Sequence, residues 1–346
     1  MSLINTVRKK HKKTLFTTPS HGQRFFISHK FLQFYKSDIS ETETHNPQKA
    51  LHDAEQHAAK IYGTKYTRFL TNGSTSGIIA AVLTCVKPDE KVLLWSEAHP
   101  SHLNAVKLAG AKPVFYTLQL VEEWGIFDRT PQQLLEQHLK KDKIKAVIVT
   151  SPSYEGLVSD IENIKKICEK YSVYLIVDEA HGALYPFSSK LPQSAVNIAD
   201  FCIHSLHKTA GGLNPTALIH SNSLNPDEAL AMINTTSPSY PLLASIEANI
   251  NFLNSARGKK HLETLLNNIK SLKKSSRYEF FGDDITKINI KHAKMSGQEL
   301  SRLLFDKYGI EDEKTNEKSV LLLCGIGTDE KKLMRLQKAL NGIARF

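Results

Sequence analysis

The feature that most constrains the fold is a repeated alternation of short apolar runs with segments of helical periodicity through the middle of the chain. Val173–Val177 is an apolar run that follows Ile161–Tyr171, an amphipathic segment whose apolar side chains recur on one stripe. Lys145–Thr150 and Ala199–Ser205 are further strand-like runs. Repeated βα units of this kind predict an α/β fold, with a mainly parallel sheet covered by helices on both faces.

The rest of the chain divides into units around this sheet. Thr216–His220 is expected to return antiparallel to Ala199–Ser205, and the pattern after Glu247 is helical to about Lys274. We expect an N-terminal helical segment (1–62), a large domain (63–255) and a linking helix with a small C-terminal α+β domain (256–346). Further elements are expected at Gln48–Ile61, Lys91–Trp95, Pro100–Ala109, Lys112–Tyr116, Thr286–Ile290, Ser296–Tyr308 and Val320–Cys324.

Composition and charge are those of an ordinary globular protein. Apolar residues make up 41% and charged residues 23% of the chain, and no run reaches the roughly 18 apolar residues of a membrane span. Met1–Lys13 lacks the apolar core of a signal peptide, so we expect a cytoplasmic protein without a membrane partner. The net charge of +10 is spread widely and includes no basic motif interleaved with aromatic residues, which favours solvated faces over a nucleic-acid partner.

The cysteines show no pattern of ligands or disulfides. All four are scattered within or beside apolar stretches, and no C-x-x-C pair occurs. This spacing predicts buried free thiols and no metal site. The four residues are Cys85, Cys168, Cys202 and Cys324.

Two polar residues that follow predicted strands carry the main chemical signal. Asp178 ends one apolar run, and Lys208 follows another beyond Ser205. Carboxyl ends of parallel strands meet at one edge of a sheet, so both side chains are expected to face one cleft. The lysine can hold pyridoxal 5'-phosphate (PLP) as a Schiff base, while the carboxylate keeps the pyridine nitrogen protonated. A surface lysine and an ion-paired aspartate at a strand end are the simpler alternatives.

A phosphate site is predicted where Thr71–Gly77 opens an apolar helix. Glycines and hydroxyl groups at a helix N-terminus leave backbone N–H groups free for an anion. The stretch matches neither common nucleotide motif, and an ordinary N-capped helix would look the same. The residues expected around the phosphate are Gly73, Ser74, Thr75, Ser76 and Ser205.

Several residues are expected around the cofactor ring. His99 is the choice for stacking on its free face, with His102 in its place, or a helix-capping role for His99, as the alternatives. Ala180 is small enough to let the ring lie against the backbone. His181 is expected near the phenolic oxygen, or else as a structural hydrogen-bonding histidine. Ser153 follows another predicted strand and is expected at the same edge.

Taken together, these motifs resemble the fold-type I PLP decarboxylases of ornithine, lysine and arginine. The matching stretches run in order over roughly residues 15 to 340. The resemblance implies an aspartate aminotransferase-like fold, with a mainly parallel seven-stranded sheet and a small α+β C-terminal domain. The stretches are Thr18–Gly22, Phe69–Thr75, Ala98–Ser101, Ala109–Val114, Ser151–Gly156, Asp178–Ala183, Ser205–Thr209 and Thr236–Tyr240.

The resemblance also implies roles for individual residues. Lys208 would be the Schiff-base lysine, and His207 would lie near the phosphate and the substrate. Enzymes of this fold are homodimers with shared active sites, so Thr236 and Ser237 are expected to reach the partner's site. The catalytic residues that the resemblance implies are Lys208, His207, Asp178 and His99.

Three departures from the family pattern bear on function. Ser20 stands where the family has glycine, Asn214-Pro215 stands where it has Thr-Gln, and relatives continue beyond the position of Phe346. We therefore expect a C-terminally shortened member, without the N-terminal wing domain of the large acid-induced decarboxylases.

The expected function is decarboxylation of an amino acid, with lysine, arginine or ornithine as the substrate and CO₂ and an amine as the products. The alternatives are another fold-type I reaction, such as that of an aminotransferase, a lyase or an aldolase, and a shortened PLP-binding paralogue without catalytic activity.

Overall fold

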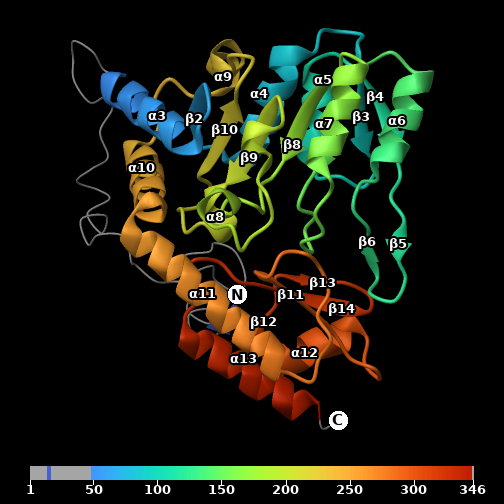
Figure 1. Cartoon of the computed structure of the whole chain (residues 1–346), viewed down its shortest axis with the longest axis vertical. Coiled ribbons are helices and arrows are strands. Elements are labelled where there is room, and N and C mark those ends of the chain that lie inside the picture. Colours follow the sequence, from blue (N-terminus) through green and yellow to red (C-terminus); the bar gives the residue numbers. More distant parts are fainter. Residues whose placement is uncertain (1–13, 17–47, 345–346) are drawn as a thin grey trace, which may run out of the picture.

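The chain forms a large α/β domain and a smaller α+β domain joined by long helices (Figure 1). The computed structural model describes residues 14–16 and 48–344. The expected match at Thr18–Gly22, and most of the predicted N-terminal segment, lie outside the described residues.

A seven-stranded sheet forms the centre of the large domain, as expected, in the order β2-β10-β9-β8-β7-β3-β4. The five strands from β9 to β4 pair in parallel, because a helix or a longer crossover connects each to the next. Strand β10 is antiparallel to both of its neighbours, which confirms the predicted return beside β9. The strands are β2 (Tyr66–Leu70), β3 (Lys91–Trp95), β4 (Lys112–Tyr116), β7 (Ile144–Thr150), β8 (Tyr174–Asp178), β9 (Phe201–Ser205) and β10 (Ala217–Ser221).

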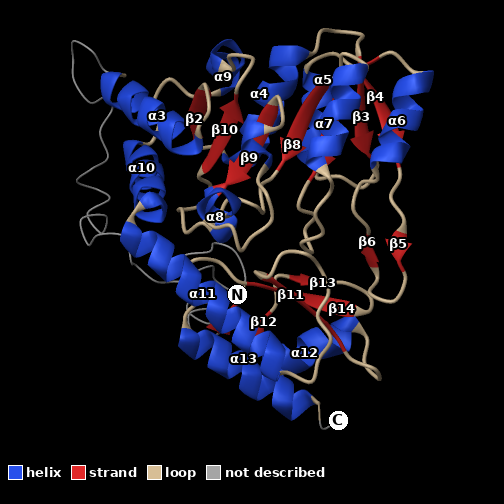
Figure 2. Ribbon diagram, viewed as in Figure 1, coloured by secondary structure: helices blue, strands red, loops and turns tan. Residues whose placement is uncertain are grey.

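Helices cover both faces of this sheet, and successive strand residues alternate between two cores (Figure 2). In β8, Leu175 and Val177 join one apolar cluster and Ile176 joins the other. Both faces are therefore buried, which explains why the strands read as continuous apolar runs. One face holds α4 (Gly73–Cys85), α5 (Pro100–Leu108) and α9 (Asp227–Ile233), and the other holds α3 (Lys49–Tyr62), α6 (Gln132–Lys141), α7 (Ile161–Lys170) and α10 (Tyr240–Asn254).

The link between the domains is two helices, where the sequence pattern had predicted one continuous helix. Helix α10 ends at Asn254, and α11 (Ala256–Ser275) begins after Ser255, whose backbone is extended. The hydroxyl oxygen of Ser255 accepts a hydrogen bond from the N–H of Gly258 at 3.0 Å, so Ser255 caps the second helix. Apolar periodicity continues through the break, and for this reason the pattern did not reveal it.

The small domain follows α11. It contains a three-stranded antiparallel sheet in the order β11-β14-β13, with α11, α12 and α13 packed near it. We propose that the large domain ends and the C-terminal unit begins near Ser255, as predicted from the sequence. The elements are β11 (Lys287–Lys291), α12 (Gly297–Tyr308), β12 (Ile310–Glu311), β13 (Lys314–Thr315), β14 (Ser319–Leu323) and α13 (Glu330–Ile343), and β12 pairs with β1 (Thr14–Leu15).

A hairpin of β5 (Leu120–Val121) and β6 (Ile126–Phe127) extends from the large domain to the small one (Figure 1). Trp124 at its tip is buried and stacks on Phe281 with the ring centroids 5.1 Å apart. Ser319 donates a hydrogen bond from Oγ to the carbonyl oxygen of Trp124 at 2.8 Å. This hairpin was not predicted from the sequence, because each of its strands is only two residues long.

All four cysteines are buried free thiols, as predicted. Within residues 14–16 and 48–344, no helix is both long enough and apolar enough to cross a membrane.

Candidate active site

Lys208 lies in α8 (Leu206–Thr209), a single helical turn directly after β9. Its amine nitrogen Nζ lies 3.1 Å from Nε2 of His181. Burial lowers the pKa of Lys208 below that of an ordinary lysine; Lys287 lowers it further, and Asp178 opposes the shift. The amine is thereby brought closer to the neutral form that reacts with an aldehyde.

Asp178 is the last residue of β8, and both of its carboxylate oxygens accept hydrogen bonds. His102 lies with Nε2 2.8 Å from Oδ2, and the N–H of Ala180 donates to Oδ1 at 3.1 Å. Burial by itself raises the pKa of this carboxyl, but His102, Lys208 and the N–H of Ala180 outweigh burial and hold the pKa below its ordinary value. Asp178 is therefore held as a buried anion.

His102 was considered as an alternative to His99 for stacking on the cofactor ring. In the structure, His102 belongs to α5 and its imidazole contacts the Asp178 carboxylate instead. The contact joins residues 76 positions apart. The sequence signal for it was the spacing His99-x-x-His102, which places two imidazoles near one helix end.

Lys208 and Asp178 line the same cavity, as the order of the strands predicted. Its volume is about 320 Å³, within the size range of small-molecule sites. Part of its lining comes from the β5–β6 hairpin and part from the small domain, through Lys314 and Asn316. The other predicted residues that line it are Ser74, His99, Ser153, Ala180 and His181.

The N-terminus of α4 lies beside this cavity and has the features of an anion site. Asn72, at the N-cap position, makes no side-chain capping hydrogen bond, and Gly73 has a φ of +76°. The hydroxyl of Ser205 lies 3.4 Å from that of Ser74, so β9 and α4 bring two hydroxyls together. Ser76 instead donates its hydroxyl to the carbonyl oxygen of Gly73 at 2.8 Å.

His99 caps α5, which was the alternative to its predicted stacking role, and it also lines the cavity. Its Nδ1 accepts a hydrogen bond from the N–H of Ser101 at 3.2 Å and so caps α5, while its side chain lines the cavity. Burial lowers the pKa of His99. The ring is therefore held at the cavity wall by its cap, and burial disfavours its protonation.

His181 lies between the two domains. Its ring centroid is 4.4 Å from that of Tyr154, whose hydroxyl donates to Oε1 of Glu313 in the small domain at 2.7 Å. Burial, followed by the charge of Lys208, holds the pKa of His181 well below its ordinary value. Its Nδ1 is buried, with no hydrogen-bond partner among the described residues. The ring is neutral and has one unused polar atom.

The comparisons with known proteins decide the family. The family profile described as "Orn/Lys/Arg decarboxylase, major domain" matches residues 3–294.

The chain belongs to the Orn/Lys/Arg decarboxylase family.

Related proteins and solved structures agree with this assignment. The arginine decarboxylase of Bacillus cereus is 27% identical over 359 residues, which cover 96% of this chain and 77% of that protein. The lysine decarboxylase LdcF of Francisella novicida has a similar structure, with a TM-score of 0.78 at 18% identity, covering 90% of this chain and 54% of that one. The constitutive lysine decarboxylase of Escherichia coli gives a TM-score of 0.77 at 20% identity, with coverage of 90% and 54%. The chain spans about half the length of these two solved structures.

PLP is the cofactor of the Orn/Lys/Arg decarboxylase family, and the fold is that of the fold-type I PLP enzymes. The residues present fit this cofactor. An amine of lowered pKa and a buried carboxylate line one cavity, and an uncapped helix N-terminus lies beside it.

Some residues that were predicted to lie in the cofactor site do not line the cavity. His207 lies beside it with Nδ1 3.3 Å from the carbonyl oxygen of Thr216, and burial lowers its pKa to about 4. Thr236 lines a separate hollow of about 470 Å³ near Glu55 and Arg68. The other predicted residues outside the cavity lining are Gly73, Thr75, Ser76, Ser205 and Ser237.

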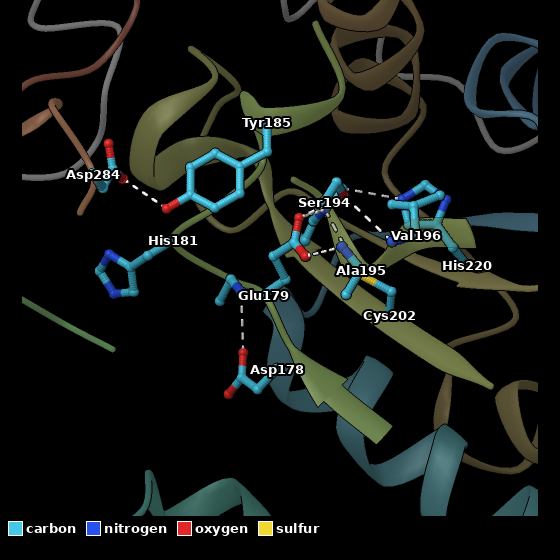
Figure 3. A network of polar contacts seen from close by, with 12 residues as sticks. Asp178, Glu179, His181, Tyr185, Ser194, Ala195, Val196, Cys202, His220 and Asp284 are labelled. Atoms are coloured by element: carbon cyan, nitrogen blue, oxygen red, sulfur yellow. Dashed lines mark hydrogen bonds and ion pairs between the residues drawn. The ribbon is translucent and has the colours of Figure 1, made fainter. Parts of the chain in front are cut away.

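A buried polar network supports the end of β8 behind the site (Figure 3). Glu179 accepts hydrogen bonds from Ser194 Oγ at 2.6 Å, the N–H of Ala195 at 2.5 Å and Nε2 of His204 at 3.0 Å. Glu179, Cys202 and His204 are close enough to hold a metal ion. However, both carboxylate oxygens already accept hydrogen bonds, and burial raises the pKa of the Cys202 thiol well above its ordinary value. The arrangement therefore favours a structural anchor over a metal site.

Proposed function

We propose that this protein is a PLP-dependent decarboxylase that converts a basic amino acid, namely lysine, arginine or ornithine, to CO₂ and an amine. The single observation that carries the proposal is that Lys208 and Asp178 line one cavity next to the N-terminus of α4. Membership of the Orn/Lys/Arg decarboxylase family supports the same reaction. The proposed catalytic residues are Lys208, Asp178, His99 and His207.

Each residue would act on one part of the cofactor. When bound, PLP supplies an aldehyde for amines and a ring that accepts the electron pair left by CO₂. Lys208 would bind the aldehyde carbon, and Asp178, kept anionic by His102, would hold a proton on the ring nitrogen. His99 would lie against one ring face and Ala180 against the other. The phosphate-binding residues would be Gly73, Ser74, Thr75, Ser76 and Ser205, with Ser153 and His181 at the ring substituents.

Lys208 is the stronger of the two candidates for returning a proton to the substrate carbon. Its amine lies inside the cavity, 3.1 Å from Nε2 of neutral His181, so the two groups can share a proton. His207 is the weaker candidate, because its Nδ1 lies within hydrogen-bonding distance of the Thr216 carbonyl and its ring does not line the cavity. We therefore assign His207 a supporting role near the phosphate.

The lining also contains groups suited to a cationic substrate side chain. Glu97, Asp128 and Glu155 all line the cavity. Carboxylates favour ammonium and guanidinium groups, through charge and through charge-assisted hydrogen bonds. Glu155 is paired with Lys314 at 2.5 Å, and Asp128 is paired with the Arg129 guanidinium at 3.5 Å, so Glu97 is the better candidate. A basic amino acid is the substrate class that this lining supports.

We also propose that the protein acts in the cytoplasm as a homodimer with shared active sites. Thr236 and Ser237 would then approach the partner's cavity, since Thr236 lies outside the cavity of its own chain.

One observation favours a second function, transamination. Arg129 lines the cavity, and an aminotransferase must hold the carboxylate that a decarboxylase expels. Its guanidinium is already paired with Asp283 at 3.2 Å, which makes it less available to a substrate. Decarboxylation remains the better supported reaction.

The test is to incubate the PLP-loaded protein separately with lysine, arginine and ornithine, and to measure CO₂ and keto acid. CO₂ with a stoichiometric amine is the expected result. Keto acid without CO₂ would establish the aminotransferase, and a visible cofactor band without turnover would establish a non-catalytic paralogue. Lys208→Ala should abolish the band and the activity, while Lys190→Ala, at a lysine outside the cavity, should change neither.

A further inference from the structure

Lys287 is a fully buried lysine at the boundary between the domains. It is the first residue of β11 and has 0% of its surface exposed. Lysines are almost never fully buried without a specific partner. Its Nζ donates to the main-chain carbonyl oxygen of His181 at 3.3 Å and lies 3.4 Å from Oδ2 of Asp284. The side chain thus joins the small domain to a loop of the large one.

Asp284 holds the same loop at a second point. Its Oδ2 accepts a hydrogen bond from the hydroxyl of Tyr185 at 3.0 Å, and its Oδ1 accepts from the N–H of Thr286 at 2.8 Å. Figure 3 shows Asp284 facing the ring of Tyr185, with His181 nearby on the same stretch of chain. The pair Lys287–Asp284 therefore contacts the segment after β8 at two residues, His181 and Tyr185.

Close packing leaves the Lys287 side chain little freedom. A Cβ atom added at Gly156 would lie 2.6 Å from Cγ of Lys287 and 3.1 Å from Cβ of Asp284. Gly156 also has a φ of +88°, which glycine adopts without strain. The main chain at Gly156 therefore packs closely against the stem of Lys287, whose ammonium lies between the His181 carbonyl and the Asp284 carboxylate.

We propose that Lys287 is a positioning residue for Lys208 and acts through the main chain of His181. Only one residue separates the two lysines, because the carbonyl of His181 contacts Lys287 and its imidazole contacts Lys208. Lys287 lies in none of the sequence motifs that indicated the cofactor site. The inference rests on the proposed role of Lys208 in holding PLP, and it adds a residue of the small domain to that site.

The positive charge of Lys287 also affects the reacting amine directly. After burial, Lys287 is one of the causes that lower the pKa of both Lys208 and His181. A second positive charge nearby disfavours protonation of the reacting amine. Besides Lys287, the titratable groups facing Lys208 are Asp178, Glu313, His181, His99, His207 and Tyr154.

The test is the pKa of the Lys208 amine in Lys287→Met, measured without cofactor. Labelling of Lys208 by an amine-reactive acylating reagent would be followed by peptide mass spectrometry from about pH 7 to 11. We expect the pKa of Lys208 to rise by about one unit, so that labelling at pH 8 slows about tenfold. The matched control is Lys273→Met, which removes the ammonium that donates to the Lys287 carbonyl at 3.0 Å and should leave the Lys208 pKa unchanged.

The inference is overturned if Lys287→Met lowers only the melting temperature while the Lys208 pKa stays equal to that of the control. If Lys287→Met fails to fold, the double variant Lys287→Met/Asp284→Asn takes its place. It removes both buried charges and so leaves no unpaired carboxylate at Asp284. We expect it to fold and to show the same upward direction, because the contact with the His181 carbonyl is lost in both. A wild-type pKa of Lys208 in the folded double variant would also reject the inference.

This measurement separates the inference from the proposed function. In PLP-loaded protein, Lys287→Met should lower kcat about tenfold with little change in KM, because it alters the reacting amine and leaves the cavity lining in place. Wild-type protein that forms no visible cofactor band would refute the proposed function, while the labelling experiment would still decide the role of Lys287.

Discussion

Nε2 of His102 lies 2.8 Å from Oδ2 of Asp178, and both side chains are buried. This contact is the main influence that keeps Asp178 ionised against the effect of burial. Without the imidazole, the effect of burial would be less fully offset, and the pKa of the Asp178 carboxyl would rise.

His102→Phe should therefore weaken cofactor binding and make it more sensitive to acid. The folded pKa of Asp178 is depressed, so its contribution to binding and stability is present above its ordinary pKa and is lost as the pH falls through the folded value. In the variant this loss should occur at a higher pH, with PLP affinity about tenfold lower at neutral pH. Spectrophotometric PLP titrations at several pH values would check this. His57→Ala, at an exposed histidine, is the control, and equal acid sensitivity in the two variants would contradict the prediction.

Glu55→Gln should remove a pH dependence of stability. Burial raises the pKa of Glu55 from 4.5 to about 7, although the Phe69 N–H and Arg68 oppose the shift. The folded state then binds a proton that the unfolded state releases, so the free energy of unfolding should fall by about 3 kcal/mol as the pH rises from 4.5 to 7.

Urea unfolding of Glu55→Gln at pH 5 and pH 8 would measure this difference. The variant should match the wild type at pH 5 and exceed it at pH 8, because an amide has no proton to lose. Glu247→Gln, at an exposed glutamate, should behave as the wild type does at both pH values. A wild-type protein equally stable at the two pH values would disprove the assignment.

Trp124→Ala should destabilise the protein by about 3–5 kcal/mol, the range for truncation of a buried aromatic side chain. It should also lower activity, because the hairpin that carries Trp124 supplies Gly125, Ile126 and Phe127 to the cavity lining. Thermal unfolding and steady-state kinetics would be compared with those of Leu120→Ala, which changes an exposed residue of the same hairpin. Wild-type kinetics in a folded Trp124→Ala protein would show that the hairpin does not shape the site.

Gly258→Ala should weaken the junction between α10 and α11. A Cβ atom at this position would clash with the carbonyl oxygen of Phe252, a backbone atom that cannot move without shifting the helix. We expect a loss of about 2–3 kcal/mol in the free energy of unfolding, as for overpacking in other tight contacts. Denaturant unfolding would measure it, with Lys259→Ala on an exposed position as the control. A loss below about 0.5 kcal/mol would mean that the helices separate at little cost.

Local patterns predicted the sheet and the centre of the site because each signal lies within a few residues. Short continuous apolar runs located β7, β8 and β9, and the polar residues at the ends of β8 and β9 placed Asp178 and Lys208 at one edge. The glycine and hydroxyl residues of the first turn of α4 marked its N-terminus. The break at Ser255 was missed, since one capping hydroxyl interrupts a helical pattern that continues on both sides.

By itself, then, the sequence determined the α/β architecture and the presence of an amine and a carboxylate at the ends of neighbouring strands. Only the tertiary structure decided what surrounds them: His102 against Asp178 and Lys287 beneath His181, contacts that span 76 and 106 residues. The physical reason is that periodicity reports which face of an element is buried, whereas hydrogen bonds and charges act between whatever side chains folding brings within a few ångströms.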